Sequence, residues 1–250
     1  MEIKKIITET INIISKNKIS FMKNFLPFLL TLSVIGIVGY TWDIGTKLTQ
    51  ETPDLSYIPL IFIAIFVILV ILAKSIVHTH RTFILNESAT LSELFKLTKR
   101  DFRFIRKFIG LSLCMMLLGI VMMIAFSQFY IRIAKGTEHE VVVLLLGLIT
   151  TLVPAFFWSR LAIVLPSAAM EDNLSISNAW SVSSNYTWTL FVGVGVIPVI
   201  TKLILSYIPS YESIIYSAGI GLLSAIILII EIGILSLTYK AITENNKSAM

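Results

Sequence analysis

Three ionisable side chains lie inside long apolar stretches of the sequence, where a charge is expensive to bury. They are Lys74, Arg160 and Glu231. A charged residue at the centre of a membrane helix costs about 2.5–3.5 kcal/mol on insertion scales, so such residues mark structural pairs or paths for ions and protons. Lys74 is close to a following loop, and we expect its long side chain to reach the membrane surface.

The other two charges predict a pair. Arg160 precedes Pro166, and Glu231 precedes Lys240, at similar distances from the ends of two apolar segments. At about 1.5 Å of rise per residue, both side chains lie about 9–13 Å from those ends. We therefore predict an ion pair between Arg160 and Glu231 that clamps two helices, with an ion or proton relay as the alternative.

Residue patterns of soluble enzymes are missing from the sequence. His78 and His80 are two positions apart, so they do not share a helix face, and no cysteine accompanies them. The sequence has neither a phosphate-binding loop of the P-loop type nor a nucleophile elbow. We expect no catalytic residues, no metal site and no cofactor, and hence a protein that is not an enzyme.

The composition indicates which elements must position these residues. Of 250 residues, 56% are hydrophobic and only 14% are charged, which is too apolar for a soluble domain of this length. We predict an all-α polytopic membrane bundle in one domain, residues 1–250. Because a spanning helix needs about 20 apolar residues, six transmembrane segments are expected: about 21–42, 57–77, 105–131, 141–166, 188–208 and 213–239.

The basic residues predict the orientation of the chain. Fourteen Lys and Arg lie in the N-terminal segment, the 78–107 segment and the C-terminal tail, against four in the segments on the other side. By the positive-inside rule, both termini are expected in the cytoplasm. The Ile-, Lys- and Asn-rich composition is typical of an AT-rich bacterial genome, so we expect the bacterial inner membrane.

Amphipathic stretches on the expected cytoplasmic side predict contact with lipid. Residues 3–14 and 91–105 each place apolar side chains on one helical face, and residues 174–187 are rich in Ser and Asn. A basic stretch overlaps the second of these, and we expect it to bind anionic headgroups rather than nucleic acid. Its members are Lys96, Lys99, Arg100, Arg103, Arg106 and Lys107.

Two further patterns concern how the helices are arranged. The order helix, amphipathic segment, helix occurs over 57–131 and again over 141–208, which would be a parallel repeat. Few residues are identical between the two, so duplication and chance both stay open. At an offset of 85, Glu87 aligns with Asp172, Ser92 with Ser177 and Phe95 with Trp180.

Small residues recur at every fourth position near the C-terminal end. Ser217, Gly221 and Ala225 form a ridge on the sixth apolar segment. Such a ridge lets the backbone of another helix approach closely. We therefore expect helix packing at these three positions.

One segment has a pattern of residue types that is found in a known family. The matching residues are Arg160, Leu161, Leu165, Pro166, Glu171, Ala179, Ser183 and Trp188. The segment resembles bacterial inner-membrane proteins that include the YciC-like proteins and the membrane domain of some glycerophosphodiester phosphodiesterases. The resemblance implies a six-helix membrane fold and a role in envelope homeostasis. In the family pattern, Arg160 and Glu171 would fix the bend at Pro166, and Trp188 would anchor at the interface.

These patterns together favour a non-enzymatic integral membrane protein. It would be a scaffold or accessory subunit whose partners are inner-leaflet lipids, preferably anionic, or another membrane protein, and not nucleic acid. A transporter that uses Glu231 and Arg160 in a polar cavity is the first alternative. A lipid-modifying membrane enzyme is the second, and the Ser- and Asn-rich 174–187 segment would serve it.

Overall fold

The chain is helical throughout the part that the structure describes. The computed structural model describes residues 3–41, 55–133, 139–206 and 214–248, and no strand occurs among them. The longer helices are α1 (Ile3–Lys16), α2 (Lys18–Thr41), α4 (Ile58–Leu85), α6 (Lys99–Ile133), α7 (His139–Leu161), α11 (Ile197–Ser206) and α12 (Ile214–Ser248). Between them lie the short helices η1 (Leu55–Tyr57), α5 (Leu91–Phe95), α8 (Val164–Ala169), α9 (Ile176–Val182), η2 (Ser184–Tyr186) and α10 (Thr187–Leu190), and the π-helical segment η3 (Phe191–Val196).

Six helical segments are long and apolar enough to cross a membrane, as the sequence predicts. The all-α membrane fold is thereby confirmed. The main difference lies at the ends. Helix α4 continues to Leu85 and α12 to Ser248, beyond the predicted ends at 77 and 239. Both extensions contain polar residues, which hydropathy assigns to loops. In α4 most of these residues are buried, whereas beyond Tyr239 of α12 the buried residue is Ile242 and the polar ones are half-buried or exposed where described.

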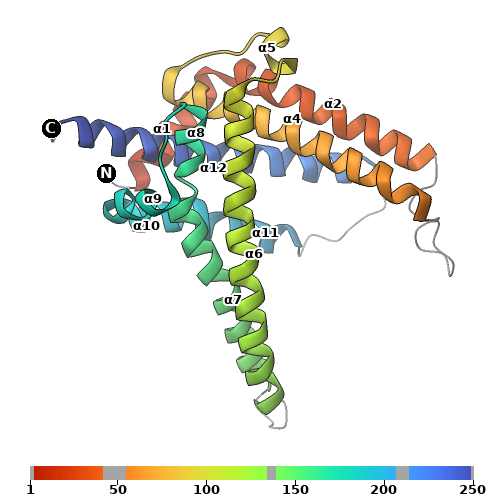
Figure 1. The fold of residues 1–250 in the computed structure, drawn as a ribbon, viewed down its shortest axis with the longest axis vertical. Coiled ribbons are helices and arrows are strands. Elements are labelled where there is room, and N and C mark those ends of the chain that lie inside the picture. Colours follow the sequence, from red (N-terminus) through yellow and green to blue (C-terminus); the bar gives the residue numbers. More distant parts are fainter. Residues whose placement is uncertain (1–2, 42–54, 134–138, 207–213, 249–250) are drawn as a thin grey trace.

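The long helices diverge from a shared end (Figure 1). Helices α2 and α4 lie side by side and extend in one direction together with the N-terminal part of α12, which packs on α4, whereas α6 and α7 extend together in another. The C-terminal part of α12 continues past the shared end on the other side. The short helices α1, α5, α8 and α9 gather where the long ones meet. The core lies at this end, and its most deeply buried members include Ile6, Val77, Phe104, Ile163 and Ile234.

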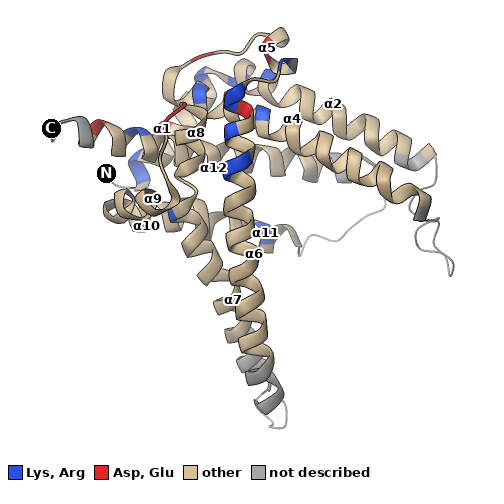
Figure 2. Cartoon of the chain, in the orientation of Figure 1, with Lys and Arg blue, Asp and Glu red and all other residues tan. Residues whose placement is uncertain are grey.

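Charge is concentrated at the same end. Figure 2 shows Lys and Arg at the start of α6, on α1 and near the C-terminal end of α12, whereas the far stretches of α4, α6 and α7 carry almost none among the described residues. Exposed apolar side chains such as Phe62, Val121 and Met123 cover those far stretches. An apolar stretch with a charged end matches a bilayer core bounded by a polar surface.

The three amphipathic segments are helical, but two differ from the expectation. Residues 91–105 do not form one helix, since α5 ends at Phe95 and α6 begins at Lys99. Helix α1 packs on the protein itself rather than only on a surface: Ile6 and Thr10 are fully buried. A Cβ on Gly233 of α12 would come within 2.5 Å of the Thr10 side chain, so glycine permits this close packing.

The proposed internal repeat is visible in the hydrogen bonds. Thr82 donates to the carbonyl of Glu87 (2.8 Å), and Ser167, 85 residues later, donates to the carbonyl of Asp172 (3.1 Å). Asn86 and Glu171, also 85 apart, are the non-glycine residues with positive φ in the described chain (58° and 65°). The N-caps of α5 and α9, Thr90 and Ser175, keep the same offset. The two units therefore turn at their ends in the same way.

Candidate functional site

A buried ion pair joins α4 to the start of α6. The Lys74 ammonium lies 3.3 Å from the Asp101 carboxylate, with side chains only 4% and 0% exposed. Lys74 also donates to the carbonyl of Lys96. Asp101 accepts hydrogen bonds from the backbone N–H and the hydroxyl of Thr98, both at 2.8 Å. The expectation that Lys74 reaches the membrane surface is therefore wrong, because a carboxylate is available to it inside the fold.

Arg160 has different partners from the one predicted. Its guanidinium stacks on the indole of Trp180, 3.6 Å from the ring centroid. It also donates to the hydroxyl of Ser183 (3.2 Å) and to the carbonyl of Trp180 (2.5 Å). Arg160 therefore joins α7 to α9.

Glu231 is half-buried on α12, and Arg160 is not among its partners within the described residues. The charge that acts on Glu231 is that of Lys202, on α11. The predicted pair is thus not formed. Arg160 contacts α9, whereas the charge beside Glu231 is on α11.

The predicted basic stretch divides into two groups. Arg100 pairs with the Glu171 carboxylate at 3.9 Å, Arg103 donates to the Glu171 carbonyl at 2.9 Å, and Lys107 donates to the Leu174 carbonyl at 2.7 Å. We call these three contacts the loop tether, because they hold residues 171–174 against α6. The other three basic residues, Lys96, Lys99 and Arg106, are exposed.

The exposed group shares a face with apolar side chains. Lys99, Phe102 and Arg106 follow one another at helical spacing, and Phe102 is 58% exposed. The same face continues with Ile109 and Leu113, each about half exposed. One side of α6 therefore presents basic groups at its beginning and apolar groups further along.

The residues matched to the family pattern are dispersed. Pro166 is buried in α8, and Trp188 is 75% exposed in the first turn of α10. Glu171 contacts Arg100 and Arg103 of α6, not Arg160. The joint role of Arg160 and Glu171 at the bend is therefore replaced by two separate contacts, one to α9 and one to α6.

Gly221, at the centre of the small-residue ridge, does not pack against another helix among the described residues. A Cβ added to Gly221 would have nothing within 4 Å, and Ala225 is only half-buried. The side chain of Ser217 lies outside the described residues. The prediction of packing at Gly221 is wrong for the single chain. Close approach occurs instead further along α12, at Gly233.

Several polar contacts were not predicted from the sequence. Asn24 of α2 donates to the hydroxyl of Thr82, His80 lies 2.7 Å from the hydroxyl of Ser236, and Tyr239 donates to Asp172. A sequence signal existed for two helix starts: Thr90 with Glu93 and Thr98 with Asp101 have the spacing of capping boxes. Such spacing identifies the start of a helix, but it does not show that Asp101 also binds Lys74.

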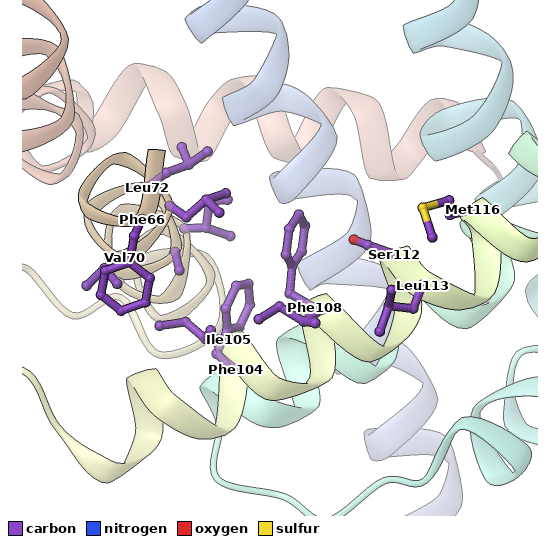
Figure 3. Close-up of a pocket in the computed structure, with 13 residues that line it drawn as sticks. Phe66, Val70, Leu72, Phe104, Ile105, Phe108, Ser112, Leu113 and Met116 are labelled. Carbon is purple, nitrogen blue, oxygen red and sulfur yellow. The ribbon is translucent and has the colours of Figure 1, made fainter. Parts of the chain in front are cut away.

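Two cavities lie between α4 and α6. The first has a volume of about 340 Å³ and is almost entirely apolar. Figure 3 shows its side chains converging from the two helices. The second, of about 370 Å³, is polar and lies between the end of α4, the following loop and the beginning of α6. Its charged or basic lining residues are His78, Arg81, Glu87, Glu93 and Arg100.

Glu93, at the rim of this polar cavity, is outside the spanning segments. Its carboxylate accepts hydrogen bonds from the backbone N–H (2.8 Å) and the hydroxyl (2.9 Å) of Thr90. These bonds favour the charged form and lower the pKa of Glu93 below its ordinary value. The cavity rim therefore keeps a fixed negative charge at neutral pH.

Comparison with known proteins gives no match for this chain. No protein-family model, no curated protein and no solved structure matches it. Its fold and its contacts are therefore the basis for inferring a function.

Proposed function

We propose that this chain is a non-enzymatic integral protein of the bacterial inner membrane, a scaffold or accessory subunit that contacts anionic lipid at its cytoplasmic surface. The resemblance of residues 160–188 to the YciC-like family agrees with this role and with one in envelope homeostasis. The orientation proposed is that of the positive-inside rule, with both termini in the cytoplasm.

One observation carries the proposal: the outward face of α6. Lys99 and Arg106 are exposed on the side that continues into the exposed apolar residues Ile109 and Leu113. When that apolar side lies against acyl chains, the two basic groups stand at the depth of the headgroups. Each basic residue near anionic lipid contributes about 1 kcal/mol, or about fivefold in the local preference for such lipid.

The test measures the lipid that surrounds the protein. The full chain is extracted with its neighbouring lipid into polymer nanodiscs, and the anionic fraction is measured by mass spectrometry. We expect enrichment of anionic lipid that falls in the double variant Lys99→Gln, Arg106→Gln. Lys202→Gln is the matched control, since it removes an exposed positive charge from α11, on the opposite side in the proposed orientation. Equal lipid composition in all three proteins would refute the proposal.

The same extraction separates a scaffold from an accessory subunit. An accessory subunit retains another membrane protein in fixed stoichiometry, and that protein must depend on this chain for its stability or activity. A chain recovered with lipid alone is the expected outcome for a scaffold. Fusion of a reporter active only in the cytoplasm, at each terminus in turn, tests the orientation; inactivity at either end contradicts it.

A second candidate function is transport, which one observation favours. The two helical units repeat their end geometry at a constant offset, and many transporters are built from such repeats. In this case Glu231, half-buried with Lys202 nearby, is the first residue to test. A substrate flux into proteoliposomes that is lost in Glu231→Gln supports transport, whereas a flux unchanged in that variant excludes a role for Glu231.

A further inference from the structure

Two of the residues that line the polar cavity at the shared end each have a buried polar atom without a partner among the described residues. His78 is 8% exposed and lines the cavity, and its Nε2 atom is buried with no hydrogen-bond partner among the described residues. The Nε atom of Arg100, on the opposite wall, is in the same condition. Because buried polar atoms in folded proteins nearly always have a partner, two such residues beside one cavity point to a ligand that forms hydrogen bonds there.

Two arginines and two glutamates line this cavity, and of the two arginines Arg100 is the one without a close counter-charge among the described residues. Arg81 is neutralised by Glu87 in a two-pronged pair at 2.7 and 2.8 Å, whereas Arg100 has only the distant Glu171 carboxylate at 3.9 Å. Lys74 also acts on His78, and its charge is balanced by Asp101. The Arg100 guanidinium thus keeps capacity for a further acceptor, and a guanidinium beside an imidazole N–H suits a phosphate oxygen.

The second unit of the internal repeat lacks these basic residues. The positions 85 residues after His78, Arg81 and Arg100 are Ile163, Pro166 and Asn185. The second unit makes the same turn without a basic residue at any of the three. The basic groups are therefore an addition to the first unit, where Arg81 also pairs with Glu87 and Arg100 with Glu171.

The apolar cavity continues along the same two helices. On α6, Phe104 and Phe108 follow Arg100 at successive turns and line the apolar cavity. On α4, Val70 lines the apolar cavity and Arg81 the polar one. They are eleven residues apart, so they face the same side to within about 20° at about 3.6 residues per turn. The two cavities therefore follow one another along α4 and α6, with the apolar one inside the spanning segments.

We propose that these two cavities together bind one phospholipid molecule. The phosphodiester accepts hydrogen bonds from His78 and Arg100, and an acyl chain lies in the apolar groove where Phe66, Phe104 and Phe108 converge (Figure 3). This inference rests on the proposed function only in placing the shared end at the inner leaflet. It adds a specific site with single occupancy to the general contact made by the outer face of α6.

The experiment measures binding to the full chain after its lipid is removed in detergent. Native mass spectrometry follows titration with three probes: dioleoyl phosphatidylglycerol, dioleoylglycerol, which lacks the phosphate, and glycerophosphoglycerol, which lacks the chains. We expect one phosphatidylglycerol to bind, and each of the other two probes to bind at least about tenfold more weakly. If glycerophosphoglycerol binds as tightly as the lipid, a soluble phosphate ester is the ligand and the lipid assignment is wrong.

Variants of the two cavities test the residues. Arg100→Gln and His78→Ala are each expected to weaken phosphatidylglycerol about tenfold. Arg103→Gln is the control for Arg100→Gln, because Arg103 also holds Glu171 but does not line the polar cavity. Wild-type affinity in both site variants would overturn the proposal, as would an equal loss in the Arg103 control.

A variant of the apolar cavity provides an independent test in case the site variants misfold. Ser112→Leu adds volume to the wall of the apolar cavity and is expected to weaken phosphatidylglycerol but not glycerophosphoglycerol. Unchanged lipid affinity in this variant overturns the position given to the acyl chain. Arg106→Gln separates the two proposals: it is expected to reduce the anionic lipid in nanodiscs and to leave the single bound lipid in place.

Discussion

Removal of one partner of the Lys74–Asp101 pair is expected to destabilise the protein strongly. Asp101→Ala leaves the ammonium of Lys74, 3% exposed, with the Lys96 carbonyl as its hydrogen-bond acceptor among the described residues. An unpaired buried charge costs about 3–5 kcal/mol. The variant also loses the helix-start contacts to Thr98, worth about 1 kcal/mol. We therefore expect a loss of about 4–6 kcal/mol, a large part of the stability of a typical domain.

A double-mutant cycle separates the charge effect from other effects. Lys74→Met alone leaves the buried Asp101 carboxylate without its counter-charge and is expected to cost about 3 kcal/mol. The double variant Lys74→Met, Asp101→Asn contains no charge and keeps an acceptor for Thr98, so it should lie within about 2 kcal/mol of the wild type.

The assay for this cycle is reversible unfolding in mixed micelles of detergent and dodecyl sulfate, followed by circular dichroism. A double variant whose loss equals the sum of the two single losses would refute the reasoning. A loss below about 1 kcal/mol in Asp101→Ala would refute it as well. Either result would mean that water reaches the pair.

Three further predictions concern contacts at the same end. Gly233→Ala is expected to cost about 1–3 kcal/mol, because its Cβ would overlap side chains of α1 and α4, whereas Gly221→Ala should be neutral or slightly stabilising; the same unfolding assay compares them. Trp180→Ala is expected to cost about 1–2 kcal/mol through loss of the ring under the guanidinium, and Trp180→Phe less. Because the pKa of Glu93 is lowered by folding, its charged carboxylate stabilises the first turn of α5 at pH values above the pKa that Glu93 has in the unfolded chain. This contribution is lost as the pH falls through the pKa of Glu93 in the folded protein. Thr90→Ala should raise that pKa towards its ordinary value, in a carboxyl-carbon NMR titration; no change would show that the hydrogen bonds do not hold the charge.

Hydropathy and length were sufficient to predict the six spanning segments, because each needs only a long apolar run. They were not sufficient for the partners of buried charges. The depth of a residue follows from its position in the run, but the direction of its side chain depends on how helices pack. For this reason Arg160 and Glu231 were given similar depths, and the real partner of Arg160, Trp180, was not found.

The basic stretch illustrates the same limit. All six of its residues are basic, but three of them bind the loop after α8. Arg103 binds that loop and Arg106 is exposed, and this difference depends on how the helices pack. The repeat was better predicted, because a constant offset is a property of the sequence. Glu87 and Asp172, which align at the offset of 85, each lie in a turn with the same hydrogen bond. Their carbonyls accept it from Thr82 and Ser167 respectively.

The loop tether has a consequence for the order of events during synthesis. Arg103 and Lys107 leave the ribosome 68 and 67 residues before the carbonyls that they bind. At about 5–20 residues per second, about 3–14 seconds pass in between. During that interval both cations are available to the insertion machinery and to lipid phosphates. Closure of the tether then fixes α6 to the chain that follows α7, so these two side chains gain their partners in the fold only after that later segment has been made.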